Sequence, residues 1–209
     1  MKGDIFHIIN RGVDKRVIFN DNDDYTRFCN NLEDFNDKRN VEESYYNRTK
    51  LKEIFVKNDK NKLVDILCVV LMPNHFHILA REKIDGGASL FSKKITSGYT
   101  QAFNLKNKRS GVLFQGRTKK ILVVKDEHFY ILPFYIFSNP IKLLESNWKK
   151  EGLKSLSNVK KFIKNYKWSS LNNEKLKQII DRNKFLDIFN VENEKKFIED
   201  FDNWLESFG

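Results

Sequence analysis

The chain has 209 residues, a length that suits one domain with a core of its own. Hydrophobic residues make up 40% of it, which excludes an intrinsically disordered chain. The formal net charge is +10, and the excess lies in residues 83–170, where 18 Lys and Arg stand against 5 Asp and Glu, whereas the rest of the chain is slightly acidic. This segregation favours a phosphate-binding face over a merely solvated basic surface.

The two cysteines, Cys29 and Cys68, lie far apart and in no metal-binding or redox spacing. This use of cysteine is typical of a reducing cytoplasm. The longest apolar run, residues 66–72, is too short to cross a bilayer, and the N-terminus has no apolar leader. We therefore expect a cytoplasmic, nucleoid-associated protein that has no membrane partner.

The first part of the chain predicts strands around one helix. Residues 5–10 are typical of a strand, and residues 25–35 have helical spacing. Residues 36–62 are polar and highly charged, which indicates a peripheral insertion. Residues 64–81 predict two strands that meet at a turn formed by Pro73-Asn74.

The second part predicts helices around one further strand. Ser89 is expected to cap a helix that extends to Asn104, followed by a basic loop and a strand over residues 118–124. Asp126 is expected to cap a helix that reaches Phe137 and ends at Asn139-Pro140. We expect one domain, residues 1–147, and an extension, residues 148–209, that packs on the same domain as loops and amphipathic helices.

His75 and His77 lie two residues apart in a predicted strand, so their imidazoles leave the same face. Two neutral imidazoles on one rigid strand provide two ligands of a divalent metal site. Two histidines that alternate by chance are the alternative. The position of the pair after Pro73-Asn74, in a chain with only 4 His, favours ligands.

Tyr135 and Asn139 lie four residues apart near the end of a predicted helix, so one helix face presents a phenol and an amide. A phenol can act as a nucleophile that forms a covalent intermediate. An amide oxygen is a suitable ligand for Mg²⁺ or Mn²⁺. A core tyrosine and a helix-ending asparagine are the alternative interpretation.

The stretch 106–120 alternates cations with small residues and contains Phe114, a composition that can hold a phosphate backbone and stack a base. A solvated loop or a structural hairpin is the alternative. The position of the stretch at the centre of the charge excess favours nucleic acid.

Several blocks, in order, resemble the single-tyrosine HUH transposases, and most of all the REP-associated tyrosine transposases. The resemblance extends from about residue 5 to residue 170. The blocks are Phe6-His7-Ile8-Ile9-Asn10-Arg11-Gly12, Met72-Pro73-Asn74-His75-Phe76-His77-Ile78-Leu79, Tyr99-Thr100 to Phe103-Asn104, Arg109-Ser110-Gly111, Phe114-Gln115-Gly116-Arg117, Tyr135-Ile136 with Asn139-Pro140, and Tyr166-Lys167-Trp168-Ser169-Ser170.

The resemblance implies an α+β fold, a ferredoxin-like sandwich with a central antiparallel sheet and a C-terminal helical extension. It implies that His75, His77 and Asn139 hold Mg²⁺ or Mn²⁺ and that Tyr135 is the nucleophile. The implied reaction is metal-dependent nicking and strand transfer of single-stranded, hairpin-containing DNA through a 5′-phosphotyrosine, without a nucleotide cofactor. The expected DNA contacts are Asn10, Arg11, Arg109, Gln115, Arg117, Lys119 and Lys120.

Two features depart from the family pattern. Pro133 precedes Tyr135 by two residues, where it either starts or kinks the helix, and it makes Tyr130 and Tyr99 rival nucleophiles. The insertion at residues 36–62 is longer than expected. It either decorates the domain or contacts DNA or a partner.

Three other functions compete with this reading. A domesticated DNA-binding protein without cleavage activity is the main alternative. An RNA-binding module and an HUH replication or conjugation initiator fit the motifs less well.

The long tail favours a monomer, and a dimer is the alternative.

Overall fold

The computed structural model describes residues 1–39, 61–125 and 128–209. Its centre is a four-stranded antiparallel sheet in the order β2-β3-β1-β4. Along the chain, one helix follows β1 and another follows β3, and in the sheet β1 and β3 are the two central strands. This combination of chain order and strand order is the ferredoxin-like arrangement. The predicted fold class is confirmed. The elements of this unit are β1 (Ile5–Arg11), α1 (Asn22–Asp34), β2 (Val64–Met72), β3 (His75–Glu82), α3 (Gly87–Lys106) and β4 (Lys119–Leu122).

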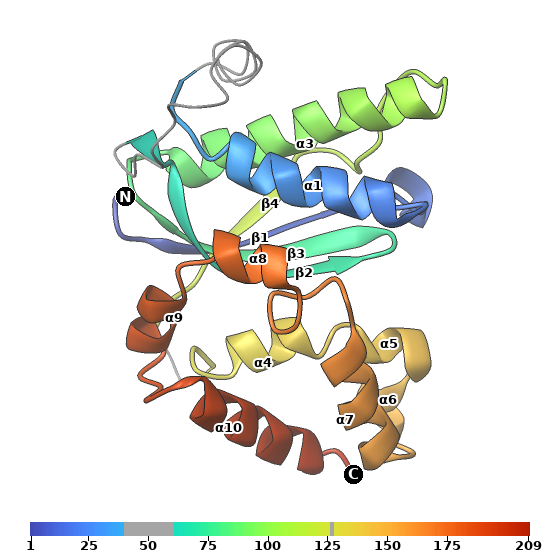
Figure 1. Cartoon of the computed structure of the whole chain (residues 1–209), viewed down its shortest axis with the longest axis vertical. Coiled ribbons are helices and arrows are strands. Elements are labelled where there is room, and N and C mark those ends of the chain that lie inside the picture. Colours follow the sequence, from blue (N-terminus) through green and yellow to red (C-terminus); the bar gives the residue numbers. More distant parts are fainter. Residues whose placement is uncertain (40–60, 126–127) are drawn as a thin grey trace.

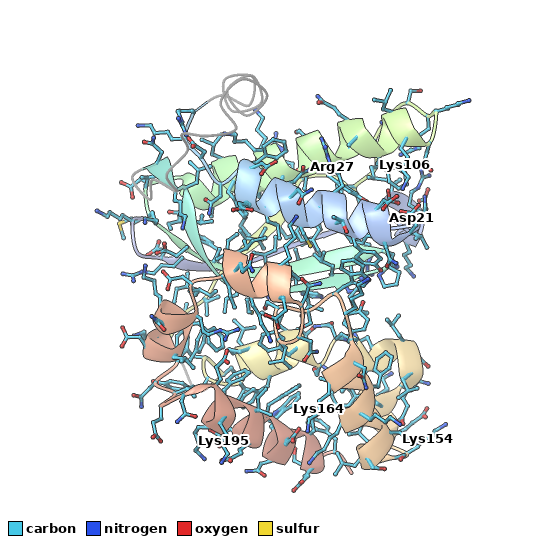
Figure 2. All side chains as sticks on the ribbon, viewed as in Figure 1. Asp21, Arg27, Lys106, Lys154, Lys164 and Lys195 are labelled. Carbon is cyan, nitrogen blue, oxygen red and sulfur yellow. The ribbon has the colours of Figure 1, made fainter. Side chains whose placement is uncertain are left out.

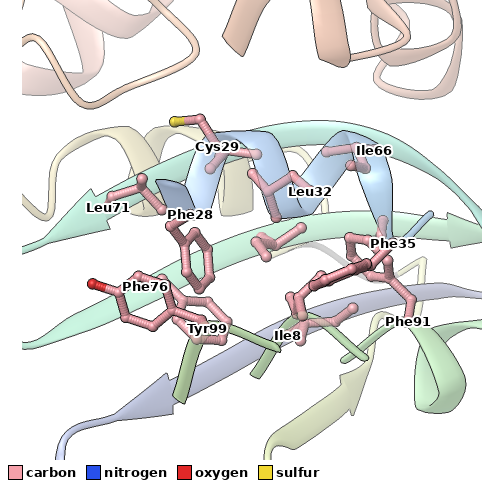
Figure 3. Close-up of a cluster of buried hydrophobic side chains, with 14 of the residues drawn as sticks. Ile8, Phe28, Cys29, Leu32, Phe35, Ile66, Leu71, Phe76, Phe91 and Tyr99 are labelled. Carbon is pink, nitrogen blue, oxygen red and sulfur yellow. The ribbon is translucent and has the colours of Figure 1, made fainter. Parts of the chain in front are cut away.

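Helices α1 and α3 cover one face of the sheet (Figure 1). The strands contribute Ile8 and Phe76 to the core beneath them, and the helices contribute Phe28 and Tyr99 (Figure 3). All four side chains are at most 1% exposed. Because alternate strand residues point to opposite faces, the burial of Phe76 on this face places its neighbours His75 and His77 on the other face.

The opposite face is covered by helices from the second half of the chain, with α4 and α10 below the sheet in Figure 1. A second core forms there, and it joins strand residues such as Cys68 and Leu79 to Phe137, Trp148 and Phe201. Residues on both sides of position 148 thus share one core. The helices are α4 (Leu132–Phe137), α5 (Ile141–Leu144), α6 (Trp148–Glu151), α7 (Leu156–Asn165), α8 (Glu174–Ile179), α9 (Arg182–Ile188) and α10 (Glu194–Glu206).

The outer edge of β2 is closed by the segment 168–170. The Leu71 amide donates to the Trp168 carbonyl over 2.9 Å, and the Ser170 amide donates to the Val69 carbonyl over 2.8 Å. The Trp168 ring stacks on Tyr25 of α1, with ring centroids 4.3 Å apart. These contacts tie the extension to the sheet and to α1.

The ends of α1 and α3 are joined by charge. The Lys106 ammonium contacts Asp21 at 2.7 Å and Asp24 at 2.8 Å, where the end of α3 meets the beginning of α1 (Figure 2 labels Lys106 and Asp21). Lys106 belongs to the predicted basic stretch, but its partners are these two carboxylates.

None of the helices in the described part of the chain has the length and apolar character that a membrane span needs.

The structure corrects two predicted helix starts. The helix expected to be capped by Ser89 begins two residues earlier at Gly87, where Glu82 of β3 accepts from the Ala88 amide over 2.9 Å. The helix expected from Asp126 begins at Leu132, so Pro133 lies in its first turn, where its fixed φ is tolerated. Asp126 and most of the charged insertion, residues 40–60, lie outside the described residues.

Candidate functional site

Three histidines lie on the sheet face opposite α1 and α3. His75 and His77 come from β3, and His7 comes from β1, which pairs with β3 so that Arg11 lies opposite His75 and Ile9 opposite His77. His7 lies two residues before Ile9 in β1 and therefore points to the same face. The three side chains are 5–7% exposed.

The rings of the three histidines contact one another. His7 Nε2 and His77 Nδ1 are 3.0 Å apart in a hydrogen bond, and their rings stack with centroids 5.1 Å apart. The His75 and His77 rings meet edge to face, also with centroids 5.1 Å apart. His75 Nδ1 is hydrogen-bonded to Asn74 Oδ1 over 2.6 Å. Asn74 belongs to the predicted turn, which thus orients the first histidine of the pair.

Burial keeps these imidazoles neutral. Desolvation lowers the pKa of His7 and the pKa of His75 to about 4 each, and it lowers the pKa of His77 well below its usual value. The positive charges of Arg11 and Lys142 lower the pKa of both His75 and His77 further. A neutral imidazole is the form that binds a metal ion.

The hydrogen bonds of this group fit a metal site. Asn74 Oδ1 can only accept, so His75 Nδ1 carries the proton and His75 Nε2 keeps its lone pair. His77 Nε2 is buried and has no hydrogen-bond partner among the described residues. If His77 Nδ1 donates to His7 Nε2, His77 Nε2 is also a lone pair. Metal-binding histidines characteristically have such a partner on the second nitrogen.

The predicted third ligand, Asn139, lies two residues beyond the end of α4. No group of three or more His, Cys, Asp or Glu side chains suited to a metal ion occurs in the described part of the chain. Asn139 is 3% exposed, and its Nδ2 donates to the carbonyls of Tyr135 and Ile136 over 2.9 and 3.2 Å. These bonds fix the amide so that its oxygen is the end left for a ligand. Within the described residues no hydrogen bond joins Asn139 to either histidine, so its expected role stays a prediction.

Tyr135 lies beside the histidines. Its ring meets the His77 ring edge to face, with centroids 6.5 Å apart, and the side chain is 36% exposed. Tyr135 follows Pro133 in the short helix α4, which starts at Leu132 without a kink at the proline. The structure therefore brings the predicted nucleophile to the predicted ligand pair.

The two rival tyrosines differ in their surroundings. Tyr99 is 1% exposed in the core under α1 (Figure 3). Its hydroxyl donates to the Ile18 carbonyl. Burial raises the pKa of Tyr99, which opposes its ionisation. Tyr130 is 54% exposed and packs on Phe129. In the described part of the chain, only Tyr135 has a ring contact with a histidine of the group.

Three of the seven predicted DNA contacts have side-chain hydrogen bonds within the protein. Asn10 donates to Thr118 Oγ1 over 3.0 Å. Arg109 donates to Asn104 Oδ1 and to the Val112 carbonyl, which secures the loop after α3. Lys120 bonds Ser89 of α3 on the other face of the sheet.

The remaining four, Arg11, Gln115, Arg117 and Lys119, are exposed. Lys119 lies opposite Ile9, on the sheet face of the histidines, and Arg11 lies opposite His75 on that face. Arg117 lies two residues before Lys119 in the preceding loop. These three cations are the predicted contacts best placed to meet a phosphate near the histidine pair.

Sequence reasoning assigned no role to His7. The alternation of β1 places His7 on one face with Ile9 and Arg11, but the face shared with His77 depends on the pairing register of β1 with β3. The signal that could have found it is the scarcity of histidine, because three of the 4 His in the chain form this group.

Comparison with known proteins gives little further information. No family model matches the sequence, and no curated protein matches it. A solved structure described as a REP-associated tyrosine transposase bound to a REP hairpin is similar, with a TM-score of 0.49, 17% sequence identity, and coverage of 81% of this chain and 78% of that chain. Similarity at this level does not assign a function.

Proposed function

We propose that this chain nicks single-stranded, hairpin-containing DNA and transfers the cut strand, with Tyr135 as the nucleophile. The observation that carries the proposal is the ring contact between the partly exposed Tyr135 and the buried, neutral His77, whose ring in turn meets that of His75. A phenol beside potential metal ligands is an arrangement that supports phosphoryl transfer to tyrosine. Exposure of Tyr135 leaves room for a DNA strand to approach from solvent.

In the proposed reaction, Tyr135 Oη attacks phosphorus in line. An oxygen–phosphorus bond forms, the bond from phosphorus to the 3′-oxygen breaks, the phenol proton leaves to solvent and the departing 3′-oxygen takes up a proton. The products are a 5′-phosphotyrosine and a free 3′-hydroxyl. Attack by another 3′-hydroxyl reverses the step and joins strands, so no nucleotide cofactor is needed.

The residues proposed to hold Mg²⁺ or Mn²⁺ are His75, His77 and Asn139. When bound, the ion supplies positive charge at the scissile phosphate. His7 and Asn74 hold the two imidazoles in orientation through their Nδ1 atoms. Arg11 and Lys119, on the same sheet face, supply positive charge for the DNA backbone.

The test is incubation of end-labelled, hairpin-containing single-stranded DNA from the flanks of the encoding gene with Mn²⁺. We expect a denaturant-stable protein–DNA adduct in the wild type and none in Tyr135→Phe or with EDTA. An adduct that persists in Tyr135→Phe would assign the nucleophile to another tyrosine. DNA binding without an adduct on any flank would favour a DNA-binding protein without cleavage activity.

A further inference from the structure

Lys149 of α6 lies over the ring of Tyr135, with its Nζ 3.9 Å from the ring centroid. The same ammonium is 5.3 Å from the centroid of Trp148. The Tyr135 ring thus contacts two side chains from different parts of the chain, the imidazole of His77 and the ammonium of Lys149. A cation over an aromatic face is attracted by the electron density of the ring.

The C-terminal extension fixes the position of Lys149. The preceding residue, Trp148, is 2% exposed and packs edge to face against Trp204 and Phe208, with centroids 6.2 and 5.0 Å away. The Leu153 amide donates to the Phe208 carbonyl over 2.6 Å. The short helix α6 is therefore anchored to the end of the chain.

Within the described part of the chain, no ion pair accounts for the position of Lys149 over the Tyr135 ring. Neither Lys149 nor Lys142 has an acidic partner among the residues that the structure describes. Desolvation, with the nearby charge of Lys142, lowers the pKa of Lys149 to about 8. Lys149 is exposed to solvent, yet desolvation at its contact with the Tyr135 ring and the like charge of Lys142 both disfavour its charged form. Groups perturbed in this way gather at functional sites.

We infer that Lys149 is a positioning residue for Tyr135, which holds the phenol ring against the His77 ring and offsets the negative charge that Tyr135 Oη gains as its proton leaves for the attack. This inference rests on the proposed function of Tyr135. A ring that carries negative charge attracts a cation on its face more strongly than a neutral ring does. The contact therefore strengthens towards the transition state, which is the condition for an increase in rate.

The variants that test this inference are Lys149→Met and Lys149→Arg. Lys150→Met is the matched control, because Lys150 lies on the same short helix, is exposed and loses the same charge. The measurements are the single-turnover rate constant of adduct formation at saturating hairpin DNA and the Kd for that DNA. They separate a role in the reaction from a role in binding.

We expect Lys149→Met to lower the rate constant on the order of 10-fold while the Kd changes less than about threefold. Lys149→Arg should recover most of the rate, since a guanidinium also stacks on aromatic rings. Lys150→Met should leave both quantities near the wild-type values. Equal rates in Lys149→Met and Lys150→Met, or a loss that appears wholly in the Kd, would overturn the inference.

A second measurement does not depend on activity. In protein labelled with 3-fluorotyrosine, the ¹⁹F resonance of Tyr135 is identified by its loss in Tyr135→Phe. We expect Lys149→Met to shift this resonance and Lys150→Met to leave it in place. If neither variant shifts it, Lys149 does not hold the ring and the inference fails. If the shift occurs but the wild type forms no adduct on any DNA, the proposed function fails instead.

Discussion

His7 Nε2 and His77 Nδ1 form a buried hydrogen bond of 3.0 Å between the two central strands of the sheet. The bond leaves His77 Nε2 as the free nitrogen of that ring, buried and without a partner among the described residues. A buried polar atom without a partner costs free energy, on the order of 1–3 kcal/mol, unless a ligand meets it. The hydrogen bond between His7 and His77 thus links the first strand of the fold to the proposed metal site.

The first prediction concerns His7. His7→Leu removes the hydrogen-bond partner of His77 Nδ1, and partners of this kind contribute about 10–100-fold to metal affinity. We expect His7→Leu to weaken Mn²⁺ binding by that order, as measured by isothermal titration calorimetry with DNA present. His7→Gln, whose amide can accept the same proton, should retain more affinity. The exposed His128 provides the control, His128→Gln. Equal affinity in His7→Leu and the wild type would refute a role for His7.

The second prediction concerns pH. The pKa of His7 and that of His75 are each lowered from 6.5 to about 4 by burial in the folded chain. Below pH 6.5 the unfolded chain therefore binds more protons than the folded chain, and the free energy of unfolding falls as the pH falls. The loss is about 1.4 kcal/mol for each histidine and pH unit well below 6.5.

Urea unfolding without metal at pH 7.5, 6.5 and 5.5 measures this loss. We expect the unfolding midpoint to fall most between pH 6.5 and 5.5. The fall should be smaller in His7→Gln, which has one buried imidazole fewer. A midpoint that stays constant down to pH 5.5 would show that these histidines are not held neutral by the fold.

The third prediction concerns linkage between metal and DNA. The proposed ligands His75, His77 and Asn139 are all uncharged, and the charged groups that act on the histidines, Arg11 and Lys142, are cationic. A divalent ion there is repelled by its surroundings until a phosphate contributes negative charge. We therefore expect Mn²⁺ and DNA to strengthen each other's binding about 10-fold or more, by the same factor in both directions.

The uncleavable complex of Tyr135→Phe allows this factor to be measured at equilibrium. The Kd for Mn²⁺ is compared with and without hairpin DNA, and with a DNA whose scissile phosphate is a neutral methylphosphonate. The methylphosphonate should remove most of the coupling. Tight Mn²⁺ binding in the absence of DNA would show that the protein supplies further ligands.

The fourth prediction separates two arginines of the basic stretch. Arg117 is exposed, so Arg117→Ala should weaken DNA binding and reduce the slope of log affinity against log salt by about 1, with little effect on stability. Arg109 is bonded to Asn104 and to the Val112 carbonyl, so Arg109→Ala should lower the unfolding midpoint. Anisotropy titrations at several salt concentrations, with thermal melts of each variant, distinguish the two. The reverse assignment of effects would contradict the structure.

The sequence predicted the sheet well because its strong signals are local. The apolar run of β2, the turn at Pro73-Asn74 and the alternation after His75 each depend on a few neighbouring residues. The helix starts were less predictable. Gly86 has a positive φ and provides no side-chain cap for α3, and Glu82 from the adjacent strand partly takes that role.

Contacts between distant segments could not be read from the sequence. The bond between His7 and His77 depends on strand register, and the position of Lys149 over Tyr135 depends on how Trp148 packs against the last helix. Tertiary contacts also decide whether a basic side chain is available to DNA or already forms an ion pair, as Lys106 does with Asp21 and Asp24. A motif can therefore be recognised in the sequence, whereas the residues that its side chains contact in the fold cannot.

The most direct test of the central claim is to locate the residue that carries the DNA. Wild-type protein is reacted with hairpin DNA and Mn²⁺ and digested with nuclease and trypsin, and the nucleotide-bearing peptide is sequenced by tandem mass spectrometry. Tyr130 and Tyr135 share one tryptic peptide, residues 126–142, so fragment ions between them decide. The account predicts a nucleotide mass on Tyr135. A nucleotide on Tyr130, or on a tyrosine outside this peptide, would contradict it.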